Sequence, residues 1–147
     1  MENCPFCKMT RGDIPVTKIY ESKHFYAILD KNPLVEGHAL LIPKRHYKTI
    51  DEMNEEESRQ LGIDMLNLSR KMKQYWPDLS ISNSNGEGAS QAVPHYHIHF
   101  IPRTKGDRLW DGKNSRIVFD VSSDFPRLEP SQEELGKLAK KLKGEAQ

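Results

Sequence analysis

Three of the six histidines lie in one short stretch of the chain: His95, His97 and His99. They alternate with aromatic or aliphatic residues, and alternation with period two is typical of a β-strand. On a strand, residues i, i+2 and i+4 point to the same face, so the three imidazoles would share one face. The residues between them, Tyr96, Ile98 and Phe100, would then face the core.

Imidazoles gathered on one face can perform two kinds of chemistry. Histidines at positions i and i+2 of a strand can share a metal ion, and an imidazole that titrates near neutral pH can act as a nucleophile or transfer protons. A single histidine is more often a surface residue or a hydrogen-bonded core residue, but packing gives no reason to place three together. The pattern itself leaves the metal site and the catalytic site as open alternatives.

The two cysteines of the chain, Cys4 and Cys7, form a C-x-x-C pair at the amino-terminal end. In a reducing compartment such a pair indicates metal ligands or a redox dithiol rather than a structural disulfide. A thioredoxin-like redox motif needs a strand before the first cysteine, and three residues cannot supply one. The pair therefore favours metal binding.

Composition narrows the class of protein. The chain has 147 residues, 36% of them hydrophobic, which is typical of one domain with its own core. Its 22 basic and 21 acidic residues leave a net charge of +1, which gives no overall field that would attract nucleic acid or an anionic membrane. No apolar run approaches the roughly 18 residues of a membrane span, and no signal segment opens the chain. We expect a cytoplasmic protein without a nucleic-acid or membrane partner.

Several segments have the pattern of strands. Residues 18–20 and 25–29 are separated by a short turn, and residues 38–43 form an apolar run that predicts a buried strand. Short connections between successive strands imply an antiparallel meander. Further strands are expected at residues 79–83 and 116–121.

Two segments have the pattern of helices. Asn54 and Glu57 predict a capping box, and Ser131 and Glu134 predict another. The first helix should end before Pro77 and carry one apolar stripe, formed by Leu61, Met65, Leu68, Met72 and Tyr75. The final helix should place Leu135, Leu138 and Leu142 on one side.

Residues 84–90 are small or polar and run directly into the histidine stretch. Backbone N–H groups of such a loop can approach an anion closely. An ordinary surface turn is the alternative, but the position of the loop favours a role in holding phosphate.

The histidine stretch does not stand alone, and a set of short segments accompanies it. These are Cys4-Pro5-Phe6-Cys7-Lys8, Gly12-Asp13-Ile14-Pro15, Leu29-Asp30-Lys31-Asn32-Pro33, Gly37-His38, Ile42-Pro43-Lys44-Arg45-His46 and Ile101-Pro102-Arg103. Together with the triple histidine they resemble the zinc-binding branch of the histidine triad (HIT) family of nucleotide hydrolases and transferases. The resemblance covers about residues 3–103, and residues 104–147 are expected to be a C-terminal extension, with a final helix, of a single domain spanning 1–147.

The resemblance implies an α+β, HIT-like fold with an antiparallel five-stranded sheet, a long helix and a C-terminal helix. It also implies a homodimer in which the sheets or the long helices of two subunits meet. The expected substrate is a purine nucleotide conjugate, attacked at its α-phosphorus by the middle histidine, His97. By the same resemblance, His99 contacts the phosphate and Gln91 contacts the bridging or leaving-group oxygen.

The nucleotide contacts are also implied by the resemblance. Asp30 matches the position that binds the ribose hydroxyls, and Ile14 and Ile28 match apolar residues beside the base. The phosphate loop departs from the family pattern at Ser90, where glycine is usual, and at Ala92, where a hydroxyl residue is usual. Ser84 stands where asparagine or glutamine is common, so the neighbouring Asn85 is added to the expected contacts.

The metal site follows from the same comparison. Members that bind zinc use both cysteines, a histidine after the Ile-Pro-Lys segment and the first histidine of the triad. Here these residues are Cys4, Cys7, His46 and His95. Two cysteines and two histidines suit a closed, tetrahedral, structural zinc site.

Three activities fit this set of residues. The leading hypothesis is hydrolysis of a nucleoside phosphoramidate or a dinucleoside polyphosphate through a nucleotidyl-histidine intermediate, releasing a nucleoside monophosphate. In a nucleotidyltransferase or phosphorylase, another acceptor would replace water. A nucleotide-binding sensor or interaction module is the alternative from another class of protein.

Overall fold

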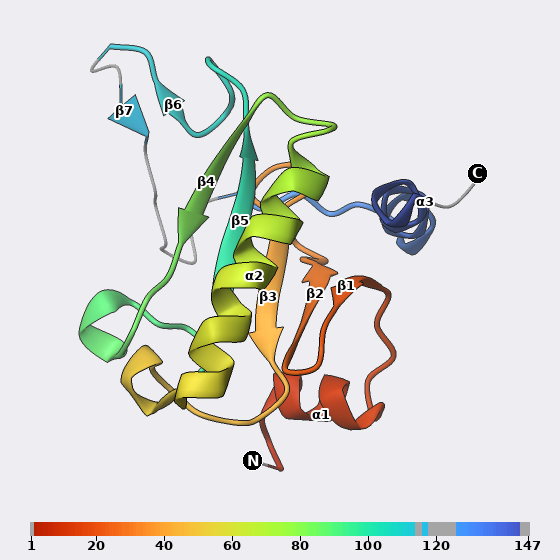
Figure 1. The fold of residues 1–147 in the computed structure, drawn as a ribbon. Helices are drawn as coiled ribbons and strands as arrows, with labels where there is room; N and C mark the ends of the chain where they lie inside the picture. Colours follow the sequence, from red (N-terminus) through yellow and green to blue (C-terminus); the bar gives the residue numbers. More distant parts are fainter. Residues whose placement is uncertain (1, 114–115, 118–125, 145–147) are drawn as a thin grey trace.

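The computed structural model describes residues 2–113, 116–117 and 126–144, and an antiparallel sheet of five strands forms its centre (Figure 1). The strands are β1 (Lys18–Glu21), β2 (Phe25–Leu29), β3 (Ala39–Pro43), β4 (Asp78–Ser82) and β5 (Ile98–Arg103). Their order across the sheet is β1-β2-β3-β5-β4, and every neighbouring pair is antiparallel. The predicted meander of the first three strands and the five-stranded sheet of an α+β fold are confirmed.

The sheet is flanked by three α-helices and several short elements. The helices are α1 (Pro5–Arg11), α2 (Glu55–Met72) and α3 (Gln132–Lys143), and the 3-10 turns are η1 (Ile50–Glu52) and η2 (Glu87–Ala89). Strand β6 (Trp110–Asp111) pairs with β7 (Arg116–Ile117) in a separate ribbon. Of the strand expected at residues 116–121, β7 is the first part, and residues 118–121 lie outside the described residues.

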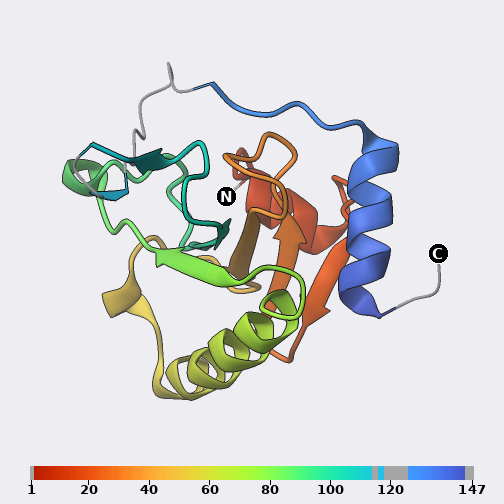
Figure 2. The ribbon, with the colours of Figure 1, turned by 90° about the horizontal axis from the view of Figure 1, so that it is seen from above.

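Different elements cover the two faces of the sheet. Figure 2 shows α2 on one face, the segment that leads into α3 on the other, and α3 beside the β1 edge. Among the described residues, none of the helices combines the length and the apolar character needed to cross a membrane.

Helix α2 begins as its sequence predicts and ends earlier. The Asn54 side chain accepts a hydrogen bond from the Glu57 N–H at 2.8 Å, and the Glu57 carboxylate accepts one from the Asn54 N–H at 3.1 Å. The helix ends at Met72. After it, the Tyr75 N–H donates to the Met72 carbonyl at 3.0 Å, a bond between residues three apart that tightens the chain into a turn. Tyr75, expected in the helical stripe, therefore lies beyond the helix.

The face of the sheet under α2 holds the larger core. Leu61, Leu68 and Met72 of α2 are buried there, as the predicted stripe requires, and Met65 packs partly buried against them. From the sheet side the same cluster receives Tyr96, Ile98 and Phe100, the residues that alternate with the histidines. Complete burial of one such side chain contributes about 1.5–3 kcal/mol. Burial of these residues fixes the histidines on the opposite face.

Strands β2 and β3 are buried on both faces. Their residues alternate between the α2 core and a second cluster, which contains Tyr26, Ile28, Leu40, Ile42 and, from α1, Phe6. This explains why residues 38–43 read as a continuous apolar run rather than as alternating residues. Helix α1 thereby covers the face that carries the histidines.

Gly37 places the start of β3. Its φ of +87° is a conformation that side chains rarely adopt, and a Cβ at this position would collide with the indole ring of Trp76 and lie 3.0 Å from Pro102. Glycine is the residue that satisfies both the turn and the close approach. The turn delivers the next residue, His38, into the site.

Candidate active site and metal centre

The predicted face of the histidine stretch is present, although the regular strand begins later than expected. Strand β5 starts at Ile98, and residues 95–97 have no partner strand in the sheet. Their backbone is held in another way: the Tyr96 N–H donates to the Tyr47 carbonyl at 2.7 Å, and the Asn83 side-chain amide donates to the His97 carbonyl at 2.8 Å. The expectation of a regular strand from residue 95 is corrected, because these partners replace the sheet ladder.

His97 has one ring nitrogen committed and one exposed to a cavity. Its Nδ1 lies 2.8 Å from the His95 carbonyl oxygen, which can only accept, so Nδ1 carries the proton and Nε2 carries the lone pair. Burial lowers the pKa of His97, with partial opposition from the hydrogen bond to His95 and from the nearby charge of Asp30. The ring is therefore neutral near pH 7, which is the form that a nucleophile requires.

His99 is oriented by a fourth histidine, His38. The Leu34 N–H donates to His38 Nδ1 at 3.1 Å, so the proton of the neutral His38 ring lies on Nε2. That nitrogen lies 2.8 Å from His99 Nδ1, which accepts, and the His99 proton is thereby placed on Nε2. Burial lowers the pKa of His38 to about 3 and of His99 to about 4, so this neutral chain of hydrogen bonds persists at physiological pH.

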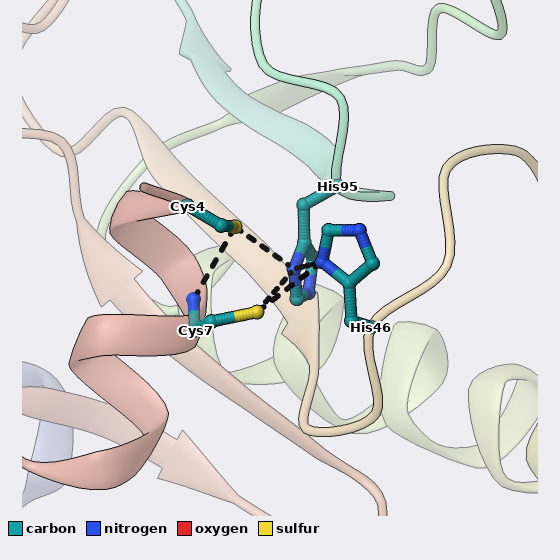
Figure 3. Close-up of side chains that lie close together, drawn as sticks. All are labelled: Cys4, Cys7, His46 and His95. Atoms are coloured by element: carbon teal, nitrogen blue, oxygen red, sulfur yellow. Dashed lines mark hydrogen bonds between the residues drawn. The ribbon is translucent and has the colours of Figure 1, made fainter. Parts of the chain in front are cut away.

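Both cysteines and two histidines converge at the amino-terminal end of the site, as Figure 3 shows. The four ligand atoms of Cys4, Cys7, His46 and His95 lie within 4.8 Å of one another. His95 Nδ1 is at the centre, 3.3 Å from Cys4 Sγ, 3.6 Å from Cys7 Sγ and 3.0 Å from His46 Nδ1. The structure thus brings together all four predicted metal ligands.

The geometry of this cluster suits a zinc ion. Bonds of about 2.0–2.3 Å to a tetrahedral centre hold ligand atoms roughly 3.3–3.8 Å apart, and the contacts of 3.0–3.6 Å among these atoms are close to that range. The His95 Nε2–H donates to the Pro43 carbonyl at 3.0 Å, so Nδ1 presents its lone pair to the cluster. Burial raises the pKa of the Cys7 thiol, and a bound cation would hold it as the thiolate.

A cavity of about 800 Å³ adjoins the histidines on the face away from α2. All three residues predicted to be catalytic line it, namely Gln91, His97 and His99. It is also lined by five of the six residues predicted to bind nucleotide, namely Ile14, Ile28, Asp30, Ser90 and Ala92. The volume lies in the range of pockets that hold small-molecule ligands.

Asp30 is the one acidic residue among the described residues that line this cavity. Its Oδ1 accepts a hydrogen bond from the Asn32 N–H at 2.9 Å. Burial raises the pKa of the Asp30 carboxyl, while that hydrogen bond and the charge of Arg127 act in the opposite direction. A carboxylate beside the apolar side chains of Ile14 and Ile28 can accept hydrogen bonds from a sugar whose base lies between aliphatic walls.

The side-chain amide of Gln91 is occupied by the loop around it. Its Oε1 accepts from the Gly86 N–H at 2.7 Å, and its Nε2 donates to the Lys48 and Val93 carbonyls at 2.8 and 3.0 Å. These bonds hold residues 86–93 in place, and a direct contact of Gln91 with the leaving group stays a prediction.

Asn85 does not line the cavity, whose walls are counted over the described part of the chain. Its side chain accepts from the Ile50 N–H at 2.7 Å and donates to the Asn83 side chain at 2.7 Å. Asn83 in turn bonds the His97 carbonyl. The geometry connects Asn85 to the backbone of His97 and gives its predicted nucleotide contact no support.

Ser90 has an unusual backbone conformation at the cavity wall. Its φ of +64° is the one positive φ among the described residues other than glycine. This left-handed conformation costs a residue with a Cβ about 1–2 kcal/mol. The resemblance implies a glycine at this position, and the backbone of Ser90 has a conformation that glycine adopts readily.

Sequence reasoning missed two contributors to the site. His38 was present in a segment that resembles the family, but its partner lies 61 positions away, so no local pattern indicates the contact with His99. Arg127 also lines the cavity and lies in the extension that carried no resemblance. Both residues are far in sequence from the histidine stretch, so the sequence pattern around that stretch could not indicate them.

Comparison with known proteins identifies the family of this chain. The family model of the HIT domain matches residues 11–106. Protein hit of Bacillus subtilis is 41% identical over 144 residues, which cover 96% of this chain and 95% of the relative. The adenosine 5′-monophosphoramidase HNT1 of Saccharomyces cerevisiae is 35% identical over 139 residues, covering 95% and 80%.

A solved structure extends the likeness to the fold. A zinc-bound histidine triad family protein from Mycobacterium smegmatis superimposes with a TM-score of 0.77 at 29% identity, covering 97% of this chain and 94% of that one. The fold, the triad and these matches define a histidine triad protein. The chain belongs to the HIT family.

Proposed function

We propose that this protein is a nucleotide hydrolase that attacks the α-phosphorus of a purine nucleotide conjugate with His97. The observation that carries the proposal is the bond from His97 Nδ1 to the His95 carbonyl, which leaves Nε2 at the wall of a cavity that also contains Asp30. The name of the yeast relative, an adenosine 5′-monophosphoramidase, supports the class of activity.

The reaction has two displacements at phosphorus. First, His97 Nε2 forms a bond to the α-phosphorus while the bond to the leaving nitrogen or oxygen breaks, and the leaving group takes up a proton. Water then attacks the same phosphorus, the bond to His97 breaks, and a nucleoside monophosphate is released. Division of one hydrolysis into two displacements lowers each barrier. The His95 carbonyl stabilises the positive charge on the phosphorylated ring through Nδ1–H.

His99 has the position of the donor for these steps. With Nδ1 accepting from His38, its Nε2–H can donate to a phosphate oxygen or to the leaving atom. Asp30 binds the ribose, Ile14 and Ile28 contact the base, and residues 90–92 approach the phosphate. Gln91 acts on the leaving-group side or, through its own hydrogen bonds, fixes that loop.

Zinc has a structural role in this proposal. Cys4, Cys7, His46 and His95 would hold it and close all four positions, which leaves none for substrate. The ion would tie α1 to the start of the catalytic stretch. Phe6 of α1 packs edge-on against the rings of both His95 and His97, at 5.6 and 5.2 Å between centroids. By fixing α1, the metal would therefore also hold the ring of His97 in place.

We also propose that the active form is a homodimer. Strand β4 is at the edge of the sheet, where Ile81 is 45% exposed, and the neighbouring α2 exposes 53% of Ile63 and 50% of Leu66. Pairing of these surfaces between two copies would cover them. Light scattering at micromolar concentration tests the proposal, and a stable monomer would contradict it.

The acceptor distinguishes the hydrolase from its alternatives. Turnover of an adenosine phosphoramidate and of a dinucleoside polyphosphate should be followed in ¹⁸O-labelled water, with and without added phosphate. A hydrolase places one labelled oxygen in the released monophosphate in both conditions. A product that incorporates phosphate favours a phosphorylase, and AMP binding without turnover of a broad substrate panel favours a sensor.

A further inference from the structure

The segment that follows the matched HIT domain forms one wall of the cavity. Beyond residue 106, where the family model ends, the described lining residues are Arg127, Gln132, Leu135 and Gly136. Figure 2 shows this segment, in blue, crossing the face of the sheet opposite α2 before it enters α3. We call residues 126–131 the strap.

The start of the strap is fixed to the loop that precedes His38. The Leu128 N–H donates to the Pro33 carbonyl at 2.9 Å. The guanidinium of Arg108 donates to the Leu34 carbonyl at 2.7 Å and to the Pro126 carbonyl at 2.6 Å, and so joins loop and strap. Arg127 is between these two attachments, so its backbone is held from both sides.

The far end of the strap is fixed by α3. The Ser131 side chain caps the helix by accepting from the Glu134 N–H at 3.1 Å. Ala139 and Leu142 are buried in the main core, and the Lys71 ammonium donates to the Leu142 carbonyl at 2.7 Å. An anchored strap is a suitable support for a binding residue, because little chain entropy remains to be lost when the ligand binds.

Charge within the cavity is scarce. Among the described lining residues, one acid, Asp30, and two fixed cations, Lys31 and Arg127, carry charge. The charge of Arg127 is felt at His38 and His99, whose pKa values it helps to lower, and at Asp30. Within the described chain, Arg127 makes no hydrogen bond or ion pair of its own, so its five N–H donors remain available for a ligand.

We propose that Arg127 binds the α-phosphate of the bound nucleotide, as a subsite that the C-terminal strap adds to the HIT domain. The subsite rests on the proposed function, because Asp30 and His99 then mark the ribose and the phosphate. In a 5′-nucleotide, the α-phosphate is the anion attached directly to the ribose, so it is the anionic group nearest to both. A guanidinium can form two parallel hydrogen bonds to phosphate oxygens, which Lys31 cannot do.

The test compares ligands that differ only in the phosphate. Binding of AMP and of adenosine is measured by calorimetry for the wild-type protein, Arg127→Gln and Arg127→Lys. Loss of a charge-assisted contact should weaken AMP binding about 10- to 100-fold in Arg127→Gln, with a smaller loss in Arg127→Lys. Adenosine binding should be unchanged. Arg59→Gln, an exposed position on α2, is the matched control that loses the same charge elsewhere.

Other outcomes overturn the proposal. An equal loss for adenosine would show that Arg127 only supports the strap, and unchanged AMP binding in Arg127→Gln would show that it does not bind the α-phosphate. If AMP binding is kept while only substrates with anionic leaving groups turn over more slowly, the residue belongs to the leaving-group side. Failure of the proposed function is separate, since it would appear as wild-type protein that binds AMP but hydrolyses no conjugate.

Discussion

In His95 and His97, two adjacent members of the histidine triad, different ring nitrogens are free: Nδ1 in the first and Nε2 in the second. His95 donates from Nε2 to the Pro43 carbonyl and presents Nδ1 to two cysteines and His46. His97 donates from Nδ1 to the His95 carbonyl and presents Nε2 to the cavity. One backbone carbonyl per ring therefore decides which nitrogen is free, and this is the basis for proposing a metal ligand in one case and a nucleophile in the next.

The third histidine shows that a side chain can make the same selection. His99 receives its hydrogen bond from His38 rather than giving one to a carbonyl, so its free nitrogen carries a proton. Three identical side chains thus present a lone pair to the cysteine–histidine cluster, a lone pair to the cavity and an N–H donor to the cavity. The difference lies in the partner of the second ring nitrogen, which tertiary structure supplies.

The largest expected effect is at the metal end. Replacement of Cys7 by Ser should abolish stoichiometric zinc and lower the thermal midpoint markedly, because structural zinc sites can contribute on the order of 10 kcal/mol of apparent binding energy. Elemental analysis and thermal unfolding, with and without a chelator, measure both quantities. A wild-type protein purified without chelator that contains no stoichiometric metal would refute this half of the comparison.

The second effect is at the cavity end. His97→Asn should lower turnover by roughly 10⁴-fold or more and remove the nucleotidyl intermediate, since the nucleophile is lost. AMP binding and zinc content should stay near the wild-type values, because Asp30 and the metal ligands are unchanged. A rapid quench into alkaline denaturant with radiolabelled substrate detects the adduct, because its nitrogen–phosphorus bond survives base and breaks in acid. An acid-labile adduct that persists in His97→Asn would place the nucleophile elsewhere.

A smaller effect is expected from the residue that orients His99. His38→Ala should reduce kcat about 10- to 100-fold, as found for partners that orient catalytic ligands, with little change in KM. His38→Gln is the matched variant, because its side-chain amide can still donate to His99 Nδ1, and it should recover part of the rate. Equal rates for the two variants would mean that the hydrogen bond to His99 does not matter.

Stability should also depend on pH at the cavity end. The pKa of His38 is about 3 when folded, well below the value of about 6.5 for free histidine, so the unfolded chain binds the extra proton as the pH falls. Folding stability should therefore decrease from about pH 6.5 down to about pH 3, by up to about 1.4 kcal/mol per pH unit for this one group. In His38→Gln, measured by denaturant titration at fixed zinc, the slope should be shallower. An unchanged slope would mean that His38 is charged in the folded protein.

Local patterns in the sequence predict the scaffold well. The buried residues that alternate with the histidines and the capping residue Asn54 are both found as predicted, although the regular strand begins only at Ile98. The same alternation left metal binding and nucleophilic catalysis open, and only the resemblance to a family assigned the roles. The contacts that select nitrogens join distant positions, such as His95 with Pro43 and His38 with His99, and no local pattern reports them.

The smallest expected effect comes from backbone strain at Ser90, which lies on the cavity wall and not at the metal cluster. Ser90 has a φ of +64° beside Gln91 on the cavity wall. Ser90→Gly should relieve the left-handed strain and stabilise the fold by about 0.5–1 kcal/mol, after allowance for the greater freedom of glycine in the unfolded chain. Denaturant titration measures the change.

Ser90→Ala separates that strain from the hydroxyl group, since alanine keeps the Cβ and loses only the oxygen. If the hydroxyl contacts phosphate, both variants should weaken AMP binding, while only Ser90→Gly gains stability. If neither variant affects AMP binding and Ser90→Gly is no more stable than the wild type, the conformation has neither a cost nor a use. Strain that is paired with weaker AMP binding in both variants would instead mark the cavity end as the part of the triad where stability has been given up for binding.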